Sequence, residues 1–177
     1  MQARTLIMTA LFIGALVARP ALAADWQMKM TMTVPYVGAE GDVATQAFTA
    51  GARSTALDGF DNQWDTVALG SSILTVYAYH PDFAVENRLL IRDFRSELFP
   101  QEWDIYVGSD QDGKPVTLTW TLPPNPACLG LSLSLTDTTT GAAVDLTQAS
   151  YGYTNDAATP RRFHLMATRA AVDCSQH

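Results

Sequence analysis

The chain has 177 residues, enough for one domain with a substantial core. Its 18 acidic and 11 basic residues give a net charge of −7, so it is unsuited to binding nucleic acid or an anionic membrane surface through phosphate neutralisation. With two cysteines, three histidines, and neither a C-x-x-C pair nor a His pair at i, i+4, the sequence excludes the usual zinc and c-type haem motifs.

The first 23 residues have the three parts of a secretory signal peptide. Arg4 supplies the positive charge, residues 6–17 form an apolar stretch, and Ala21-Leu22-Ala23 offers a small-x-small cleavage pattern. The apolar stretch is too short to span roughly 30 Å of hydrocarbon as a stable anchor. We therefore expect export to the periplasm or the extracellular space, and no membrane span in the mature chain. The segment contains two arginines and no acid, so its removal takes the net charge to −9.

Alternation of apolar and polar residues dominates the remaining chain and predicts β-strands. In the clearest run, Trp26, three methionines and Val34 alternate with polar residues up to Pro35. Further strands are expected at residues 43–50, 72–79, 88–94, 103–107, 116–120, 129–135, 143–147 and 162–169. Turn residues separate these runs, at Asp112-Gly113, 123–126, Thr140-Gly141 and Tyr151-Gly152.

These runs, about eight to ten short strands at roughly ten-residue spacing, predict a single antiparallel β-sandwich over residues 24–177. A jelly roll or small barrel is the alternative that the same pattern allows. The longest stretch without predicted structure is the loop of residues 51–71, and long loops in compact domains often carry function. Trp103 and Trp120 are expected in the core.

The two cysteines, Cys128 and Cys174, are expected to form a disulfide, because an exported chain folds in an oxidising compartment. The bridge would close a loop of about 45 residues, which contributes about 3–4 kcal/mol in the chain-entropy model. It would tie the carboxy-terminal tail to the loop that enters the strand at residues 129–135.

Six short blocks follow one another in a suggestive order between residues 55 and 170: Asp58-Gly59-Phe60-Asp61, Leu90–Arg95 (LIRDFR), Trp103–Val107 (WDIYV), Val116–Trp120 (VTLTW), Leu133–Asp137 (LSLTD) with Thr140-Gly141, and Arg162–Leu165 (RFHL). In this order and spacing they resemble an immunoglobulin- or fibronectin-like β-sandwich module of exported bacterial proteins. The resemblance implies that fold and a non-catalytic role, and it implies no particular ligand.

The loop carries the first candidate site, because Asp58, Asp61 and Asp65 lie within eight residues of one another. Carboxylates on a turning loop can supply several of the six to eight oxygens that calcium takes. Their spacing fits no EF-hand, and the alternative is that Asp58 and Asp61 shape the turn by bonding their own backbone. Calcium is therefore a possible ligand, and otherwise no cofactor is expected.

The methionines Met28, Met30 and Met32 form a second candidate site beside Trp26, since soft thioethers suit Cu(I). The alternative is that a stripe at period two is simply the core face of a half-buried strand. Of the two metals, calcium is ranked before copper.

Catalysis has no support in the sequence. No G-x-S-x-G elbow is present, and no pattern places two carboxylates across a cleft. His80 and His164 are interpreted as ordinary fold residues, and Asp93 as the partner of Arg92 or Arg95 in a structural ion pair. The protein is not expected to be an enzyme.

Exposed aromatic residues on a β-domain can anchor a protein partner or stack on sugar rings. The candidates are Trp64, Tyr106, Tyr151 and Tyr153; Tyr106 faces away from Trp103, and Tyr151-Gly152-Tyr153 is expected near a sheet edge. We therefore expect an exported binding or assembly module, an accessory subunit of an envelope or extracellular complex that docks a protein partner through sheet edges. The alternative is a small-ligand binding protein for carbohydrate or a metal ion.

Overall fold

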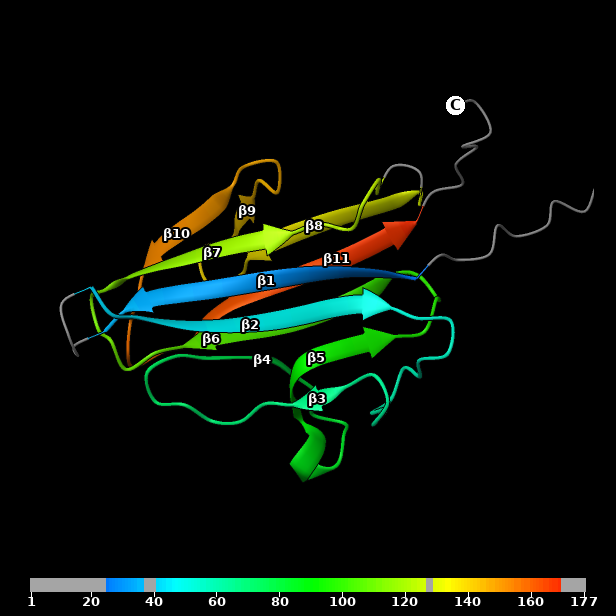
Figure 1. The fold of residues 1–177 in the computed structure, drawn as a ribbon, viewed down its shortest axis with the longest axis horizontal. Helices are drawn as coiled ribbons and strands as arrows, with labels where there is room; N and C mark the ends of the chain where they lie inside the picture. The colour runs from blue at the N-terminus through cyan, green and yellow to red at the C-terminus, as the bar shows by residue number, and fades with distance from the viewer. Residues whose placement is uncertain (1–24, 37–40, 127–128, 170–177) are drawn as a thin grey trace, which may run out of the picture.

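The computed structural model describes residues 25–36, 41–126 and 129–169, and these residues form strands joined by loops and one short 3₁₀ turn (Figure 1). The strands are β1 (Trp26–Pro35), β2 (Val43–Ala52), β3 (Thr66–Val67), β4 (Thr75–Tyr79), β5 (Leu89–Arg95), β6 (Gln101–Gly108), β7 (Pro115–Thr121), β8 (Leu131–Asp137), β9 (Ala142–Val144), β10 (Ser150–Thr154) and β11 (Arg161–Arg169), with the 3₁₀ turn η1 at Val85–Asn87. The all-β prediction is confirmed. Among the described residues, no helix has the length and apolar character needed to cross a bilayer.

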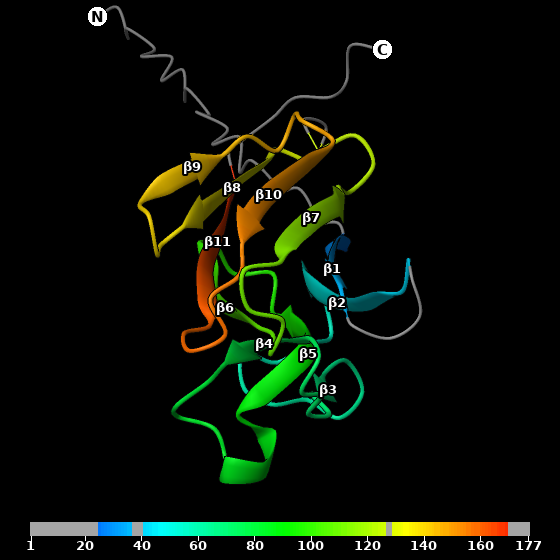
Figure 2. The ribbon, with the colours of Figure 1, turned by 90° about the vertical axis from the view of Figure 1, so that its left-hand side faces the viewer.

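All the strands belong to one sheet, in the order β10-β7-β1-β2-β5-β4-β6-β11-β8-β9, with β3 paired to β5. The sheet curls until its two ends approach each other, so its shape is that of a nearly closed barrel (Figure 2). An immunoglobulin-like sandwich is not confirmed, and the small barrel that the sequence left as the alternative is nearer to the observed shape.

The expectation of a purely antiparallel sheet is wrong at one pair of strands. β2 and β5 run parallel, with Thr49 opposite Arg92 and Ala52 opposite Arg95. The chain between them, residues 53–88, includes β3, β4 and η1, and this crossover returns the chain to β5 in the direction of β2.

The segment around Tyr151-Gly152, predicted as a turn, lies within β10. Gly152 is opposite Thr117 of β7, while Tyr151 is opposite Leu118 and Tyr153 opposite Val116. Both tyrosines pack against the hydrophobic core from the inner face of the strand. The pairing with β7 and this packing hold the segment extended, although glycine weakens strands in general.

The core occupies the inside of the curled sheet. Met28, Met30 and Met32 are at most 1% exposed, as are Trp103 and Phe163. Trp26 packs edge-on against Trp103, with ring centroids 5.8 Å apart. The expected placement of Trp103 is confirmed; Trp120 is half-buried at the border of the core, where its Nε1 donates a 3.0 Å hydrogen bond to the carbonyl of Leu146.

Two sequence predictions concern residues outside the described ranges. The predicted signal peptide covers residues 1–23, and the predicted disulfide joins Cys128 and Cys174. Export and the disulfide therefore stay predictions.

Candidate functional site

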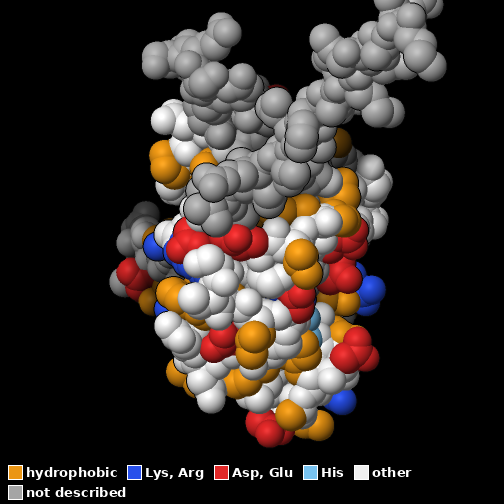
Figure 3. Space-filling model, turned by 90° about the vertical axis from the view of Figure 1, so that its right-hand side faces the viewer, with side chains coloured by type: hydrophobic (Ala, Val, Ile, Leu, Met, Phe, Trp, Pro, Cys, Tyr) orange, Lys and Arg blue, Asp and Glu red, His pale blue; other side chains and the backbone are white. Residues whose placement is uncertain are grey.

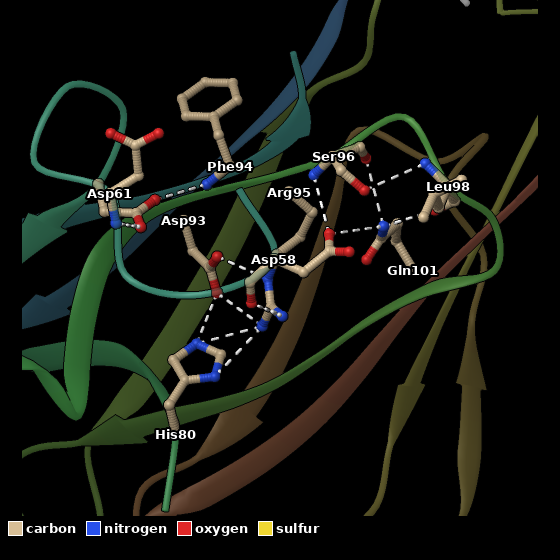
Figure 4. Close-up of polar contacts among 10 residues, drawn as sticks. Asp58, Asp61, His80, Asp93, Phe94, Arg95, Ser96, Leu98 and Gln101 are labelled. Atoms are coloured by element: carbon tan, nitrogen blue, oxygen red, sulfur yellow. Dashed lines mark hydrogen bonds and ion pairs between the residues drawn. The ribbon is translucent and has the colours of Figure 1, made fainter. Parts of the chain in front are cut away.

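The loop between β2 and β3 uses its aspartates to bind backbone amides (Figure 4). Asp65 Oδ2 accepts from the N–H of Asp61 at 2.8 Å, and Oδ1 accepts from the N–H of Phe94 on β5 at 2.9 Å. Asp61 Oδ1 accepts in turn from the N–H of Gln63 at 2.9 Å. Burial raises the pKa of Asp65, and the two backbone hydrogen bonds oppose that rise. These contacts fix the loop on the sheet.

Asp58 anchors the same loop to the segment that follows β5. Its Oδ1 accepts from the N–H of Ser96 at 3.0 Å and from Nε2 of Gln101 at 3.4 Å. Burial acts to raise the pKa of Asp58, but the hydrogen bonds from Ser96 and Gln101, with the positive charge of Arg95, lower it overall.

Beside Asp58, the side chains of His80, Asp93 and Arg95 form a buried network with Asp93 at its centre (Figure 4). Asp93 is 1% exposed; its Oδ2 lies 2.6 Å from His80 Nε2, and its Oδ1 accepts from Arg95 Nε at 2.8 Å. The His80 ring stacks on Phe83 with centroids 4.4 Å apart. Asp93 therefore pairs with Arg95, one of the two partners expected for it, and every polar group of the network faces another.

The carboxylates of the predicted calcium site accept hydrogen bonds from backbone N–H groups. In the described part of the chain, no three side chains among His, Cys, Asp and Glu are grouped so that they could hold a metal ion. Asp58, Asp61 and Asp65 each accept at least one backbone N–H, which is the alternative role considered for this loop. For copper, Met28, Met30 and Met32 are core residues at most 1% exposed. These contacts favour the structural roles of the residues over a calcium or a copper site.

Trp64 is positioned inside this loop by several contacts. Its Nε1 donates to Thr55 Oγ1 at 3.1 Å, and its ring meets that of Phe94 edge-on at 6.1 Å. The guanidinium of Arg53 lies over both rings, 5.6 Å from Trp64 and 4.5 Å from Phe94. Trp64 thus helps to hold the loop against β5 and is only half-exposed to a partner.

Tyr106 belongs to a group of side chains on the outer face of β4, β6 and β11, which we call the Tyr106 surface: Tyr77, Tyr79, Tyr106 and Arg162. Tyr77 is opposite Tyr106 in the β4–β6 register, and Arg162 is opposite Tyr106 in the β6–β11 register. The rings of Tyr77 and Tyr106 are stacked, with an interplanar angle of 6° and centroids 5.5 Å apart. Tyr79 meets Tyr106 edge-on at 6.1 Å. Three neighbouring strands therefore contribute to one aromatic row.

Arg162 ends this row. Its guanidinium carbon lies 5.2 Å from the Tyr106 ring centroid, and the side chain is exposed. Its guanidinium forms no hydrogen bond or ion pair with any of the described residues. A hollow of about 240 Å³ beside it is lined by Asp104, Ile105, Tyr106, Thr138, Arg162 and Phe163. The guanidinium thus lies over the Tyr106 ring, and no described residue accepts a hydrogen bond from it.

His164 lies next along the same face. Its Nδ1 is 2.9 Å from Asp104 Oδ1, and its Nε2 is 3.9 Å from Glu102 Oε2. The side chains of Asp104 and Glu102 are more than half exposed, so this pairing contributes little to stability. Figure 3 shows acidic and hydrophobic side chains interspersed over one side of the molecule, with basic side chains at its margins. What distinguishes Arg162 is its position over the Tyr106 ring at the end of the aromatic row.

Tyr151 and Tyr153 lie where the sheet nearly closes, and neither forms an open surface. The Tyr151 hydroxyl donates to Oδ2 of buried Asp137 at 2.8 Å, and both rings pack on Phe163. Arg161 lies over the Tyr153 ring at 4.9 Å. Burial raises the pKa of Tyr153, since it outweighs the opposing charge of Arg161. The expected position near a sheet edge is nevertheless correct, because β10 ends the sheet order.

Comparison of the chain with models of known protein families, with characterised proteins and with solved structures finds no match. The resemblance to an immunoglobulin-like module is therefore untested by these comparisons.

The sequence named Tyr106 as a surface candidate but missed its connection to Arg162. The two residues are 56 positions apart and come together only through the β6–β11 register. The only sequence signal for this surface was the spacing of Tyr77 and Tyr79, which places both side chains on one face of a predicted strand.

Proposed function

We propose that this protein is an exported, non-catalytic β-domain that binds a protein partner through the Tyr106 surface, as an accessory or assembly subunit of an envelope or extracellular complex. The observation that carries the proposal is the row of Tyr77, Tyr106 and Arg162 across three strands, with a guanidinium that no described residue pairs. Export is supported by the signal-like pattern of residues 1–23.

The composition and rigidity of the row favour a protein partner. Tyrosine and arginine are enriched among the residues that dominate binding energy at interfaces. Stacking fixes the rings before binding, so less conformational entropy is lost when a partner docks. An arginine fork matches a carboxylate with two parallel hydrogen bonds. A partner that presents an acidic side chain to Arg162 therefore fits this surface.

The small-ligand alternative has less support at the same place. The ring of Tyr77 stacks on the Tyr106 ring from β4, and the guanidinium of Arg162 lies over the Tyr106 ring from β11, on the other side of β6. Little of the ring face is therefore left for a sugar. The adjoining hollow of about 240 Å³ is below the roughly 300–1,000 Å³ typical of small-molecule pockets. Calorimetry with calcium, Cu(I) and a panel of glycans tests this alternative.

Site-specific photo-crosslinking in intact cells of the source tests the protein-binding proposal. A photoreactive phenylalanine analogue replaces Tyr79 on the Tyr106 surface, or Thr119, an exposed residue of β7, as the positional control. We expect one crosslinked protein from position 79, none from position 119, and loss of the crosslink in Arg162→Glu.

The matched charge control is Arg92→Glu, because Arg92 is exposed on β5 and is not part of the Tyr106 surface. It should leave the crosslink intact. Equal crosslinking from positions 79 and 119, or a crosslink that survives Arg162→Glu, would count against the proposal. Circular dichroism of each variant checks that the fold is retained.

A further inference from the structure

One edge of β10 has no hydrogen-bonded neighbour. Among the described residues β10 pairs only with β7, and the N–H of Asn155 donates to the carbonyl of Lys114 at 2.8 Å. This contact sets the alternation of the ladder: Tyr151 and Tyr153 exchange hydrogen bonds with β7, and the intervening residues point the other way. The outward groups are the N–H and C=O of Ser150, Gly152 and Thr154, and no described group bonds them.

The far end of the sheet does not seal this edge. The other end of the sheet is formed by β8 and β9, and in Figure 2 both strands lie beside β10. The hydroxyl of Tyr151 on β10 donates a hydrogen bond to Asp137 Oδ2 on β8. Among the described residues, no backbone hydrogen bond joins β10 to β8 or to β9. Within the described ranges, side chains close the barrel and the outward backbone groups of β10 are left unbonded.

We propose that β10 binds an extended, basic segment of a partner protein by strand addition. An unpaired row of N–H and C=O groups is complementary to one kind of ligand, another extended backbone. Gly152 has no side chain, so the middle of the edge offers no steric hindrance to an approaching backbone.

A small hollow continues the edge beyond Thr154. It measures about 120 Å³ and is lined by Thr139, Tyr153, Thr154, Asp156, Thr159 and Arg161. In strand addition, backbone bonds supply affinity, and pockets for alternate side chains supply selectivity. The hollow can take one small side chain of the added segment.

Three carboxylates near β10 favour a basic segment; the nearby cations are Lys114, opposite Asn155, and Arg161, which is paired with Asp137. Asp145 precedes the strand, and Asp156 and Asp112 lie together beyond its end, where each accepts a backbone N–H. None of the three forms an ion pair with a described residue. Hydrogen bonds from Thr147 and Gln148 hold the pKa of Asp145 below its ordinary value, so it is ionised at neutral pH.

A second copy of the chain is the weaker occupant of this edge. Each copy carries a net charge of −7, so two copies repel each other. Pairing of two five-residue strands also buries less than the roughly 1,000 Å² that a stable interface needs.

Selection from a displayed library of short random peptides on the purified protein tests the proposal. Gly152→Pro removes the outward N–H without breaking a bond to β7, and edge strands accept proline at such positions. Gly152→Ala is the matched control, since the atom nearest to an added Cβ is the Val116 carbonyl oxygen, 3.8 Å away. We expect Lys- and Arg-rich peptides whose affinity is unchanged in Gly152→Ala and falls about tenfold or more in Gly152→Pro.

Amide hydrogen exchange on the wild-type protein tests strand addition to β10 even if Gly152→Pro does not fold. The N–H of Gly152 should exchange fast in the free protein and slow down when a selected peptide is bound, while the N–H of Tyr153 is protected in both states. A peptide that binds Gly152→Pro as well as wild type, a library that yields no peptide, or a Gly152 N–H already protected in the free protein would overturn the proposal. A dimer of the wild-type protein that is lost in Gly152→Pro would also overturn the proposal, because it would show that β10 pairs with a second copy of the chain.

Strand addition and the Tyr106 surface can be tested separately. Arg162 lies on the outer face of β11, so Arg162→Glu should leave peptide affinity unchanged. Conversely, Gly152→Pro should leave the crosslink from position 79 intact. Each function can thus fail without the other.

Discussion

The hydroxyl of Tyr151 donates a hydrogen bond of 2.8 Å to Oδ2 of Asp137, and this contact joins the two ends of the sheet. Tyr151 lies on β10 at one end of the strand order, and Asp137 is the last residue of β8, next to the other end. Asp137 is fully buried and also accepts from Arg161 Nε at 2.8 Å. A buried carboxylate needs such donors, because an unpaired charge inside a protein is costly. Side chains therefore complete a closure that the backbone leaves open.

Replacing Tyr151 by phenylalanine should lower the free energy of unfolding by about 1–2 kcal/mol, because Asp137 loses one donor while the ring packing is kept. Urea denaturation measures the change. The control is Tyr79→Phe, whose hydroxyl is on a 38% exposed side chain, and which should stay within about 0.5 kcal/mol of wild type. Equal stability of the two variants would show that the hydrogen bond does not stabilise the closure.

The alternation of apolar and polar residues predicted the strands well where one face of the strand is buried and the other is in contact with solvent. The alternation from Trp26 to Val34 gave the correct core face of β1, since every apolar residue in it is buried. Glycine did not distinguish turns from strands. Gly113 and Gly141 have positive φ and lie in turns as predicted, whereas Gly152 does not have positive φ and lies in a strand. Composition alone cannot separate these cases, because the backbone conformation depends on what the flanking side chains pack against.

Contacts between distant strands could not be predicted from the sequence. The parallel pairing of β2 with β5 depends on the path of residues 53–88, which has no local signature. The Tyr106–Arg162 contact depends on the register between β6 and β11, and a shift by one residue would place Arg162 inside. The aspartate loop shows the same limit: its spacing allowed an ion site or backbone bonding, and only the positions of Ser96 and Phe94 reveal the backbone bonds.

Removing Asp93 should be strongly destabilising, because the charge of Arg95 and the polar ring of His80 would be left buried without their shared acceptor. We expect Asp93→Ala to cost about 3–5 kcal/mol in the free energy of unfolding. Asp104→Ala is the matched control, since it removes an Asp–His pair whose carboxylate side chain is 68% exposed, and it should cost less than about 1 kcal/mol. Similar losses in both variants would contradict a special role for burial.

Gly51 is predicted to tolerate no side chain. A Cβ there would overlap the carbonyl oxygen of Trp26 and lie 2.6 Å from Cε1 of Phe94. Because the carbonyl belongs to the paired strand β1, the backbone must shift, and Gly51→Ala should cost about 3 kcal/mol or more. Gly59→Ala is the control, since no atom lies within 4 Å of its added Cβ. Thermal denaturation that gave equal midpoints for the two variants would refute the close approach.

Two aspartates of the β2–β3 loop should respond to acid in opposite directions. The pKa of Asp58 is lowered in the folded state, so its contribution to stability is present above the unfolded pKa and is lost as the pH falls through the folded pKa. The pKa of Asp65 is raised by burial, so the folded state takes up its proton first, and this group adds stability as the pH falls.

Asp58→Asn should therefore lose less stability than wild type between about pH 6 and about pH 3, and Asp65→Asn should lose more. Both variants keep a side-chain oxygen that can accept one of the existing backbone hydrogen bonds, from Ser96 or from Phe94. Urea midpoints measured across this pH range, with Asp104→Asn as an exposed control, give the slopes directly. Because the two predicted changes have opposite signs, a general effect of removing negative charge cannot produce both. Parallel slopes in the two variants would refute the assigned directions of the pKa shifts.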